Sequence, residues 1–75
     1  MTSLLTTVLV FRTNASLQTD KTTITALLGQ HPEVAECSLD LEDVDRVLRV
    51  VSPSLAATQI IEIMNQKGFQ CQELE

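Results

Sequence analysis

The sequence predicts an α+β domain in which a four-stranded antiparallel sheet carries two helices on the same face. Three observations lead to this fold class. Strand-like and helix-like segments follow one another in the order β-α-β-β-α-β, only a short acidic stretch separates the two central strand-like segments, and a chain of 75 residues holds one domain. This order is the split βαβ, or ferredoxin-like, plan, and we expect residues 1–75 to form a single domain of this kind.

The first half of the chain begins with a strand-like segment and continues with a helix. β-Branched and apolar residues without glycine or proline extend from Leu5 to Arg12, which favours a strand. Ser16 or Thr19 can each cap a helix that follows. The helix should end near Gly29, which can adopt the left-handed C-cap conformation. Apolar residues recur between these points at helical spacing, as Ile24, Leu27 and Leu28.

The second half repeats the plan with a hairpin in front. From Val34 onward, apolar and polar residues alternate with the period of a half-buried strand. The segment from Arg46 to Val51 is again rich in β-branched residues, so the acidic stretch between the two should form a hairpin turn. After a proline-containing break, a second helix should end at Gly68, and Phe69 to Leu74 should form the last strand. Four apolar residues mark the buried face of that helix: Ala57, Ile60, Ile61 and Met64.

Composition restricts both the core and the partners. Because Phe11 and Phe69 are the only aromatic residues, aliphatic side chains must supply the burial, among them Leu9, Leu28, Leu39 and Ile60. A formal net charge of -5 repels phosphate backbones and anionic lipid surfaces, so we expect neither nucleic acid nor membrane as a partner. No apolar run reaches the ~20 residues needed to cross a bilayer.

The chain carries no motif of a known catalytic type. It has no Gly-x-Ser-x-Gly elbow, no glycine-rich phosphate loop and no paired buried carboxylates. We therefore expect no enzyme activity, no catalytic or cofactor-binding residues and no cofactor. With no export signal in view, we expect a cytoplasmic protein with reduced thiols.

Two segments carry a family resemblance: His31-Pro32-Glu33-Val34, before the second strand-like segment, and the run from Ile60 to Phe69, which ends in a glycine–aromatic pair. The first looks like the entry to the second strand, and the second is similar to the second helix, of the heavy-metal-associated domains, the family of small copper chaperones and of the metal-binding modules of P-type ATPases. The resemblance extends from Phe11 to Glu75 and implies the same ferredoxin-like fold. In the family, two cysteines separated by two residues follow the first strand and bind a soft ion such as Cu(I) or Zn(II).

The corresponding loop of this chain departs from that pattern. When the loop is aligned without a gap, it spans Thr13 to Asp20, and the two ligand positions hold Leu17 and Asp20. Leucine cannot donate to a metal, and one carboxylate falls short of the six to eight oxygens typical of calcium sites. We therefore expect no metal-binding residues. Asp20 should compensate the dipole of the helix, and Leu17 should anchor the loop on the domain.

Other residues of metal-binding type have ordinary structural explanations. His31 stands alone beside Pro32 and is expected at the helix C-terminus. Cys37 and Cys71 fall on the second and fourth strands, which lie on opposite edges in the strand order 4-1-3-2 of the fold, so we expect two buried thiols and no disulfide. The acidic cluster resembles a crude calcium loop but fits a solvated hairpin turn better; it consists of Asp40, Glu42, Asp43 and Asp45.

Strand alternation predicts an interaction surface on the sheet face without helices. If Leu9 and Phe11 face the helices, their neighbours Val8, Val10 and Arg12 face away. The same phase places Leu48 and Val50 inward on the third strand. The outward residues of the two central strands then form one apolar strip: Val8, Val10, Val47 and Val51.

We expect this strip to bind a protein partner or a second copy of the chain. Glu36 and Asp40 would give it an acidic rim, and Arg12 and Arg49 could pair across a two-fold axis. An alternative remains open, namely that outward valines merely satisfy β propensity.

Three functions fit the sequence. The first is a metal-independent interaction or regulatory module. The alternative is a metal carrier similar to copper chaperones that uses other ligands, with Cys37 or Cys71 contributed across a dimer. The third is a small-molecule sensor of the ACT type, which shares the order of strands and helices. It ranks last because ACT modules bind ligands near glycine-bearing turns, and the first loop here has no glycine.

Overall fold

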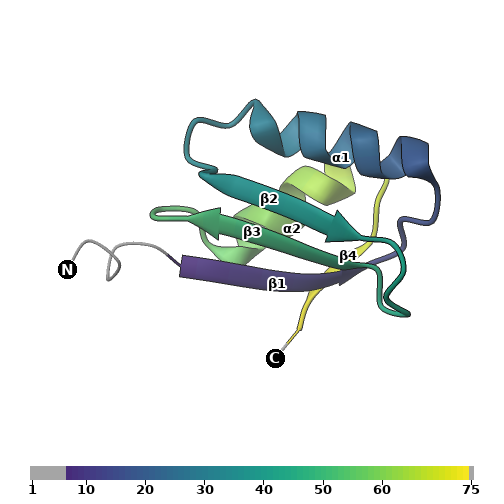
Figure 1. The fold of residues 1–75 in the computed structure, drawn as a ribbon. Helices are drawn as coiled ribbons and strands as arrows, with labels where there is room; N and C mark the ends of the chain where they lie inside the picture. The colour runs from purple at the N-terminus through teal and green to yellow at the C-terminus, as the bar shows by residue number, and fades with distance from the viewer. Residues whose placement is uncertain (1–6, 75) are drawn as a thin grey trace.

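The computed structural model describes residues 7–74, and it forms one sheet with two helices (Figure 1). The elements in chain order are β1 (Thr7–Thr13), α1 (Gln18–Gly29), β2 (Glu36–Asp40), β3 (Val47–Ser52), α2 (Ala57–Gln66) and β4 (Cys71–Glu73). The strands are ordered β2-β3-β1-β4, and each neighbouring pair is antiparallel. Figure 1 looks onto the face of the sheet that lies away from both helices. The predicted α+β, ferredoxin-like fold and its strand order are confirmed, whereas Leu5 and Thr6 of the expected first strand lie outside the described residues.

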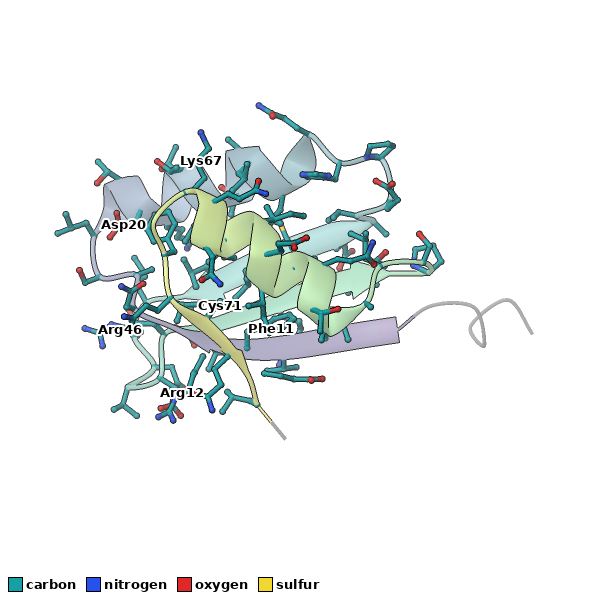
Figure 2. The ribbon with its side chains drawn as sticks, turned by 180° about the vertical axis from the view of Figure 1, so that it is seen from behind. Phe11, Arg12, Asp20, Arg46, Lys67 and Cys71 are labelled. Carbon is teal, nitrogen blue, oxygen red and sulfur yellow. The ribbon has the colours of Figure 1, made fainter. Side chains whose placement is uncertain are left out.

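The core lies between the sheet and the helices and is mostly aliphatic, as predicted. Figure 2, seen from the helix side, places Phe11 between α2 and β1, and this side chain is completely buried. Phe69 is half-buried and packs against the same core. The buried hydrophobic residues are Leu9, Phe11, Ala15, Ile24, Leu28, Leu39, Leu48, Val50, Ile60 and Met64.

The start of α1 differs from the prediction that Ser16 or Thr19 caps it. The N-cap residue is Leu17, whose backbone is extended (φ -110°, ψ 154°), and the helix begins at Gln18. The carboxylate of Asp20, at the third helical position, accepts the Leu17 backbone N–H at 3.1 Å. This contact satisfies the N–H of the N-cap residue, whereas Leu17 has no side-chain oxygen to accept an N–H of the first helical turn, as a serine or threonine cap would.

The two helices end by different means. α1 ends at Gly29 as predicted, but its C-cap residue Gln30 is right-handed (φ -77°), so the expected left-handed glycine cap is wrong. After α2, Gly68 does adopt a positive φ of 88°. The N–H of Gly68 donates to Asn65 and that of Phe69 to Met64, both at 3.0 Å. This is a Schellman motif, and it turns the chain from α2 toward β4.

The acidic stretch forms the predicted hairpin turn between β2 and β3. Asp40 Oδ1 accepts the Glu42 N–H at 3.0 Å, and Asp43 Oδ1 accepts the Asp45 N–H at 2.8 Å. Arg46 was expected to begin the next strand, but it has a left-handed backbone (φ 48°) and completes the turn. Along residues 7–74, neither helix has the length and apolar character needed to cross a membrane.

Candidate functional site

The family resemblance places a metal in the loop between β1 and α1. In this chain the carboxylate of Asp20 accepts hydrogen bonds from the backbone of that loop. Asp20 Oδ2 accepts the backbone N–H groups of both Ser16 and Leu17, each at 3.1 Å. Asp20 also lies in the first turn of α1, where a negative charge compensates the helix dipole, as predicted (Figure 2). This carboxylate therefore has a structural role in the loop backbone.

The residue that anchors this loop is Ala15, and the expectation for Leu17 is wrong. The Leu17 side chain is 61% exposed, because the extended N-cap backbone directs it to solvent. Ala15 is completely buried in the core, and its N–H donates to Thr13 Oγ1 at 3.3 Å. The sequence signal for this anchor is a small apolar residue between the polar residues Asn14 and Ser16.

The two cysteines lie on opposite edges of the sheet, as predicted. Cys37 is on β2 and Cys71 on β4, both thiols are free, and both are half-buried against the core. Burial raises the pKa of the Cys37 thiol and raises that of Cys71 to about 12. A thiol with a raised pKa is protonated at neutral pH and is a poor nucleophile and metal ligand.

The histidine and the acidic cluster have structural roles. His31 follows the C-cap of α1, as predicted, and its N–H donates to the Leu28 carbonyl at 3.1 Å. Asp45 accepts the guanidinium of Arg12 at 2.8 Å, which connects the hairpin turn to β1. Residues 7–74 contain no group of three or more His, Cys, Asp or Glu side chains positioned to hold a metal ion.

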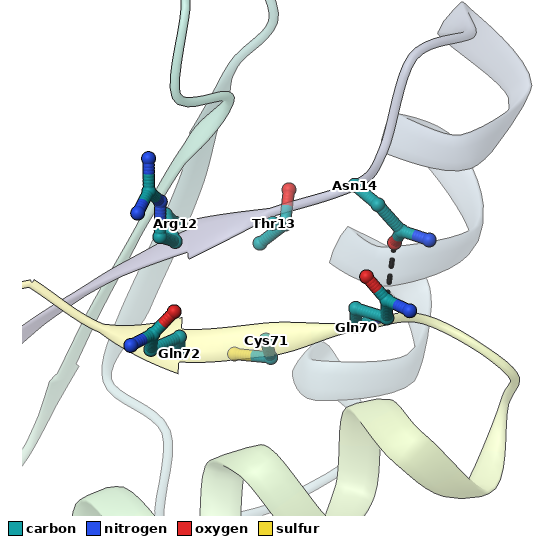
Figure 3. A pocket seen from close by; sticks show the side chains of 6 residues that line it. All are labelled: Arg12, Thr13, Asn14, Gln70, Cys71 and Gln72. Atoms are coloured by element: carbon teal, nitrogen blue, oxygen red, sulfur yellow. Dashed lines mark hydrogen bonds between the residues drawn. The ribbon is translucent and has the colours of Figure 1, made fainter.

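A shallow hollow lies along the paired residues at the end of β1 and the beginning of β4 (Figure 3). Its volume is about 330 Å³, and Asn14 and Gln70 close one end through two hydrogen bonds, with N···O distances of 2.9 and 3.3 Å. Its lining consists of Arg12, Thr13, Asn14, Gln70, Cys71 and Gln72. Because Arg12 is paired with Asp45 and the Cys71 thiol is protonated, this lining offers amides and hydroxyls for hydrogen bonding and gives no basis for acid–base or nucleophilic chemistry.

The open face of the sheet has the composition that strand alternation predicts. Val8 on β1 pairs with Val51 on β3, and Val10 pairs with Arg49. Val8 is 54% exposed, while Val10 and Val51 are half-buried. The alternate residues of the same strands are buried under the helices: Leu9, Phe11, Leu48 and Val50.

Two further side chains extend the strip toward its ends. Val47 is half-buried and lies opposite Asp40 of β2. Leu74 was not expected in the strip, but its N–H donates to the Val10 carbonyl at 2.8 Å, which places it beside Val10. The open face therefore consists of Val8, Val10, Val47, Val51 and Leu74 together with polar residues.

The charges of the open face are arranged around Arg49. This exposed side chain lies directly opposite Ser38 on β2, with Glu36 and Asp40 two residues away on either side of Ser38. Arg12, expected to be available for a two-fold contact, instead pairs with Asp45 of its own chain. Both side chains of that pair are partly exposed (51% and 34%), so the pair contributes about 1 kcal/mol or less to stability.

Comparison with known proteins gives the fold. No protein-family model and no curated protein matches the chain. Among solved structures, oxidized MerP from Ralstonia metallidurans CH34 is similar with a TM-score of 0.80 and 10% identity, covering 93% of this chain and 99% of that one. The yeast copper transporter domain CCC2A, solved in apo and Cu(I)-loaded states, is similar with a TM-score of 0.79 and 23% identity, covering 91% and 94%. At these identities the likeness establishes the fold, and the resemblance to heavy-metal-associated domains is confirmed at that level.

Proposed function

We propose that this chain is a non-enzymatic, cytoplasmic protein-interaction module that binds a protein partner, or a second copy of itself, on the open face of the sheet. The observation that carries the proposal is the cluster of apolar side chains on that face, with Val8 54% exposed at one end. Exposed apolar side chains together with a few charged ones on one face are typical of a protein-binding surface.

We also propose that this chain does not carry a metal ion. CCC2A is a copper transporter domain solved with and without Cu(I), so a metal function for this fold has to be considered. In this chain the corresponding loop has Leu17 and Asp20 at the two ligand positions, and the Asp20 carboxylate accepts two backbone N–H groups. The thiols of Cys37 and Cys71 lie on opposite edges of the sheet. These observations support the loss of the metal-binding motif.

A Cu(I) competition assay tests the metal part of the proposal. The purified chain, titrated against a colorimetric Cu(I) chelator, should bind Cu(I) no better than an unrelated protein with two buried thiols. The double variant Leu17→Cys, Asp20→Cys is the matched positive control, because it restores two thiols at helix-start spacing on the same fold. Tight one-to-one binding by the unmodified chain would contradict the proposal and favour a carrier with unusual ligands.

Affinity capture tests the docking part. The variants Val10→Glu and Val47→Glu place a carboxylate on the open face, whereas Thr58→Glu places one at an exposed position in the first turn of α2. A specific protein partner should be retained by the unmodified chain and by Thr58→Glu and lost by both valine variants. Capture that is lost only with Thr58→Glu would place the interaction on the helices.

A further inference from the structure

We propose that a second copy of this chain binds one corner of the open face, the corner formed by Val8, Val51, Arg49 and Glu36. The inference rests on the proposed function, since it names the partner of the open face. In the proposed dimer, a two-fold axis passes obliquely over Val51, and the guanidinium of Arg49 in each copy pairs with the carboxylate of Glu36 in the other. We refer to these four residues as the valine corner.

Two charges of the face that have no ion pair among the described residues lie at this corner. Among residues 7–74 the structure forms one ion pair, between Arg12 and Asp45, so neither Arg49 nor Glu36 pairs with another described side chain. At the opposite end of the face, Arg12 is engaged in that pair and Asp40 accepts the Glu42 N–H. An unpaired cation and an unpaired anion on one surface form a self-complementary pattern, which an isologous two-fold interface requires.

The strand register shows that a two-fold axis can bring these charges together. Arg49 lies two residues along β3 from Val51, a distance of about 6.8 Å, and Glu36 lies directly across from Val51 on β2, at about 4.8 Å. An axis in the plane of the face that passes over Val51, midway between these two perpendicular directions, exchanges them. It therefore lays Arg49 of one copy over Glu36 of the other, brings Val51 of the two copies together and places Val8 of each copy beside Val51 of the other. The strands of the two sheets then cross steeply, as in orthogonal sheet packing.

Other placements of the axis are less favourable. An axis that runs across the strands through Arg49 would place Arg49 on Arg49 and Glu36 near Asp40 of the other copy. Like charges facing one another across an interface oppose association. An axis parallel to the strands between β3 and β1 buries more valines but lays Arg49 over Val10 without an acidic partner. The oblique axis pairs opposite charges and places the most exposed valine, Val8, beside Val51 of the other copy.

Mixing two charge-reversed variants tests this contact directly. The unmodified chain should show a concentration-dependent dimer in sedimentation velocity, weakened by salt. Arg49→Glu alone and Glu36→Arg alone should each reduce dimerisation by roughly tenfold or more, because each homodimer then brings like charges together. An equimolar mixture of the two variants should associate again, since the hetero-pair contains only opposite charges at both contacts. Asp40→Arg is the matched control on the same strand and should leave dimerisation unchanged.

The outcomes separate this inference from the proposed function. Sedimentation as a monomer at every concentration would overturn the proposal that a second copy binds here and leave a different protein as the partner of the open face. A dimer that survives both single variants, or a mixture that stays monomeric, would overturn the valine corner as the contact. Tight Cu(I) binding by the unmodified chain would instead contradict the proposed function itself. Circular dichroism of each variant verifies that the fold is retained.

Discussion

The two faces of the sheet are built from the same strands and similar residues, yet the side chains of one face are packed under the helices and those of the other face are not. On β3, Leu48 and Val50 are completely buried under the helices, while their neighbours Val47 and Val51 are only half-buried on the open face. The covered face is fixed by packing against side chains from α1 and α2. The open face has no such constraint among the described residues, so its valines are available to a partner. A substitution on the covered face should therefore change stability, and one on the open face should change association.

The largest expected difference in the free energy of unfolding is between substitutions at two adjacent residues of β3. Leu48→Ala removes a completely buried side chain and should lower the free energy of unfolding by about 2–5 kcal/mol. Val47→Ala, on the open face, should lower it by less than about 1 kcal/mol through reduced β propensity. Urea denaturation followed by circular dichroism measures both, at concentrations low enough to avoid self-association. Equal losses would mean that the open face packs as tightly as the core within one chain.

The distinction between the two faces could be predicted from the sequence because it depends on a local rule. Side chains alternate along a strand, so the position of Phe11 in the core also determines that of Val10 and Arg12. The hairpin and the end of α2 followed from residue types with fixed conformational roles, such as Gly68. The order of the strands came from the fold to which the sequence was matched.

What could not be predicted depends on contacts distant in sequence or on local geometry. The ion pair between Arg12 and Asp45 joins residues 33 positions apart and left Arg49 as the available cation of the face. Leu17 is exposed at the N-cap position, where its N–H donates to the Asp20 carboxylate, and neither Ser16 nor Thr19 occupies that position. No periodicity or composition contains this information.

A smaller effect is expected from two serines on the two faces. Ser52 is completely buried, and its hydroxyl donates to the Glu33 carbonyl at 2.6 Å and accepts the N–H groups of Ser54 and Leu55. Ser52→Ala leaves these buried groups without partners and should cost about 1–3 kcal/mol. Ser38→Ala, at an exposed position on β2, should change stability by less than about 0.5 kcal/mol. A neutral Ser52→Ala would show that water reaches this end of the covered face.

The last difference concerns the thiols at the two edges and appears only at high pH. Because burial raises the pKa of Cys71 to about 12, the folded thiol stays protonated while the unfolded thiol ionises near pH ~8.5. Between these values the unfolded chain binds fewer protons than the folded one, so the stability conferred by the protonated thiol is complete at neutral pH and declines as pH rises.

Urea denaturation at pH 8 and pH 10.5 should therefore show a smaller loss of stability for Cys71→Ala than for the unmodified chain. Burial also raises the pKa of Cys37. Cys37→Ala is therefore the comparison at the other edge, and it too should lose less stability between pH 8 and pH 10.5 than the unmodified chain. Both thiols should react slowly with a thiol reagent in native buffer and rapidly in denaturant, since each packs partly against the core. Two results together would contradict this expectation: fast labelling of Cys71 in native buffer, and the same pH dependence of the free energy of unfolding in Cys71→Ala and in the unmodified chain. They would mean that β4 opens readily at the edge of the sheet and that the covered face is packed less firmly there than at β3.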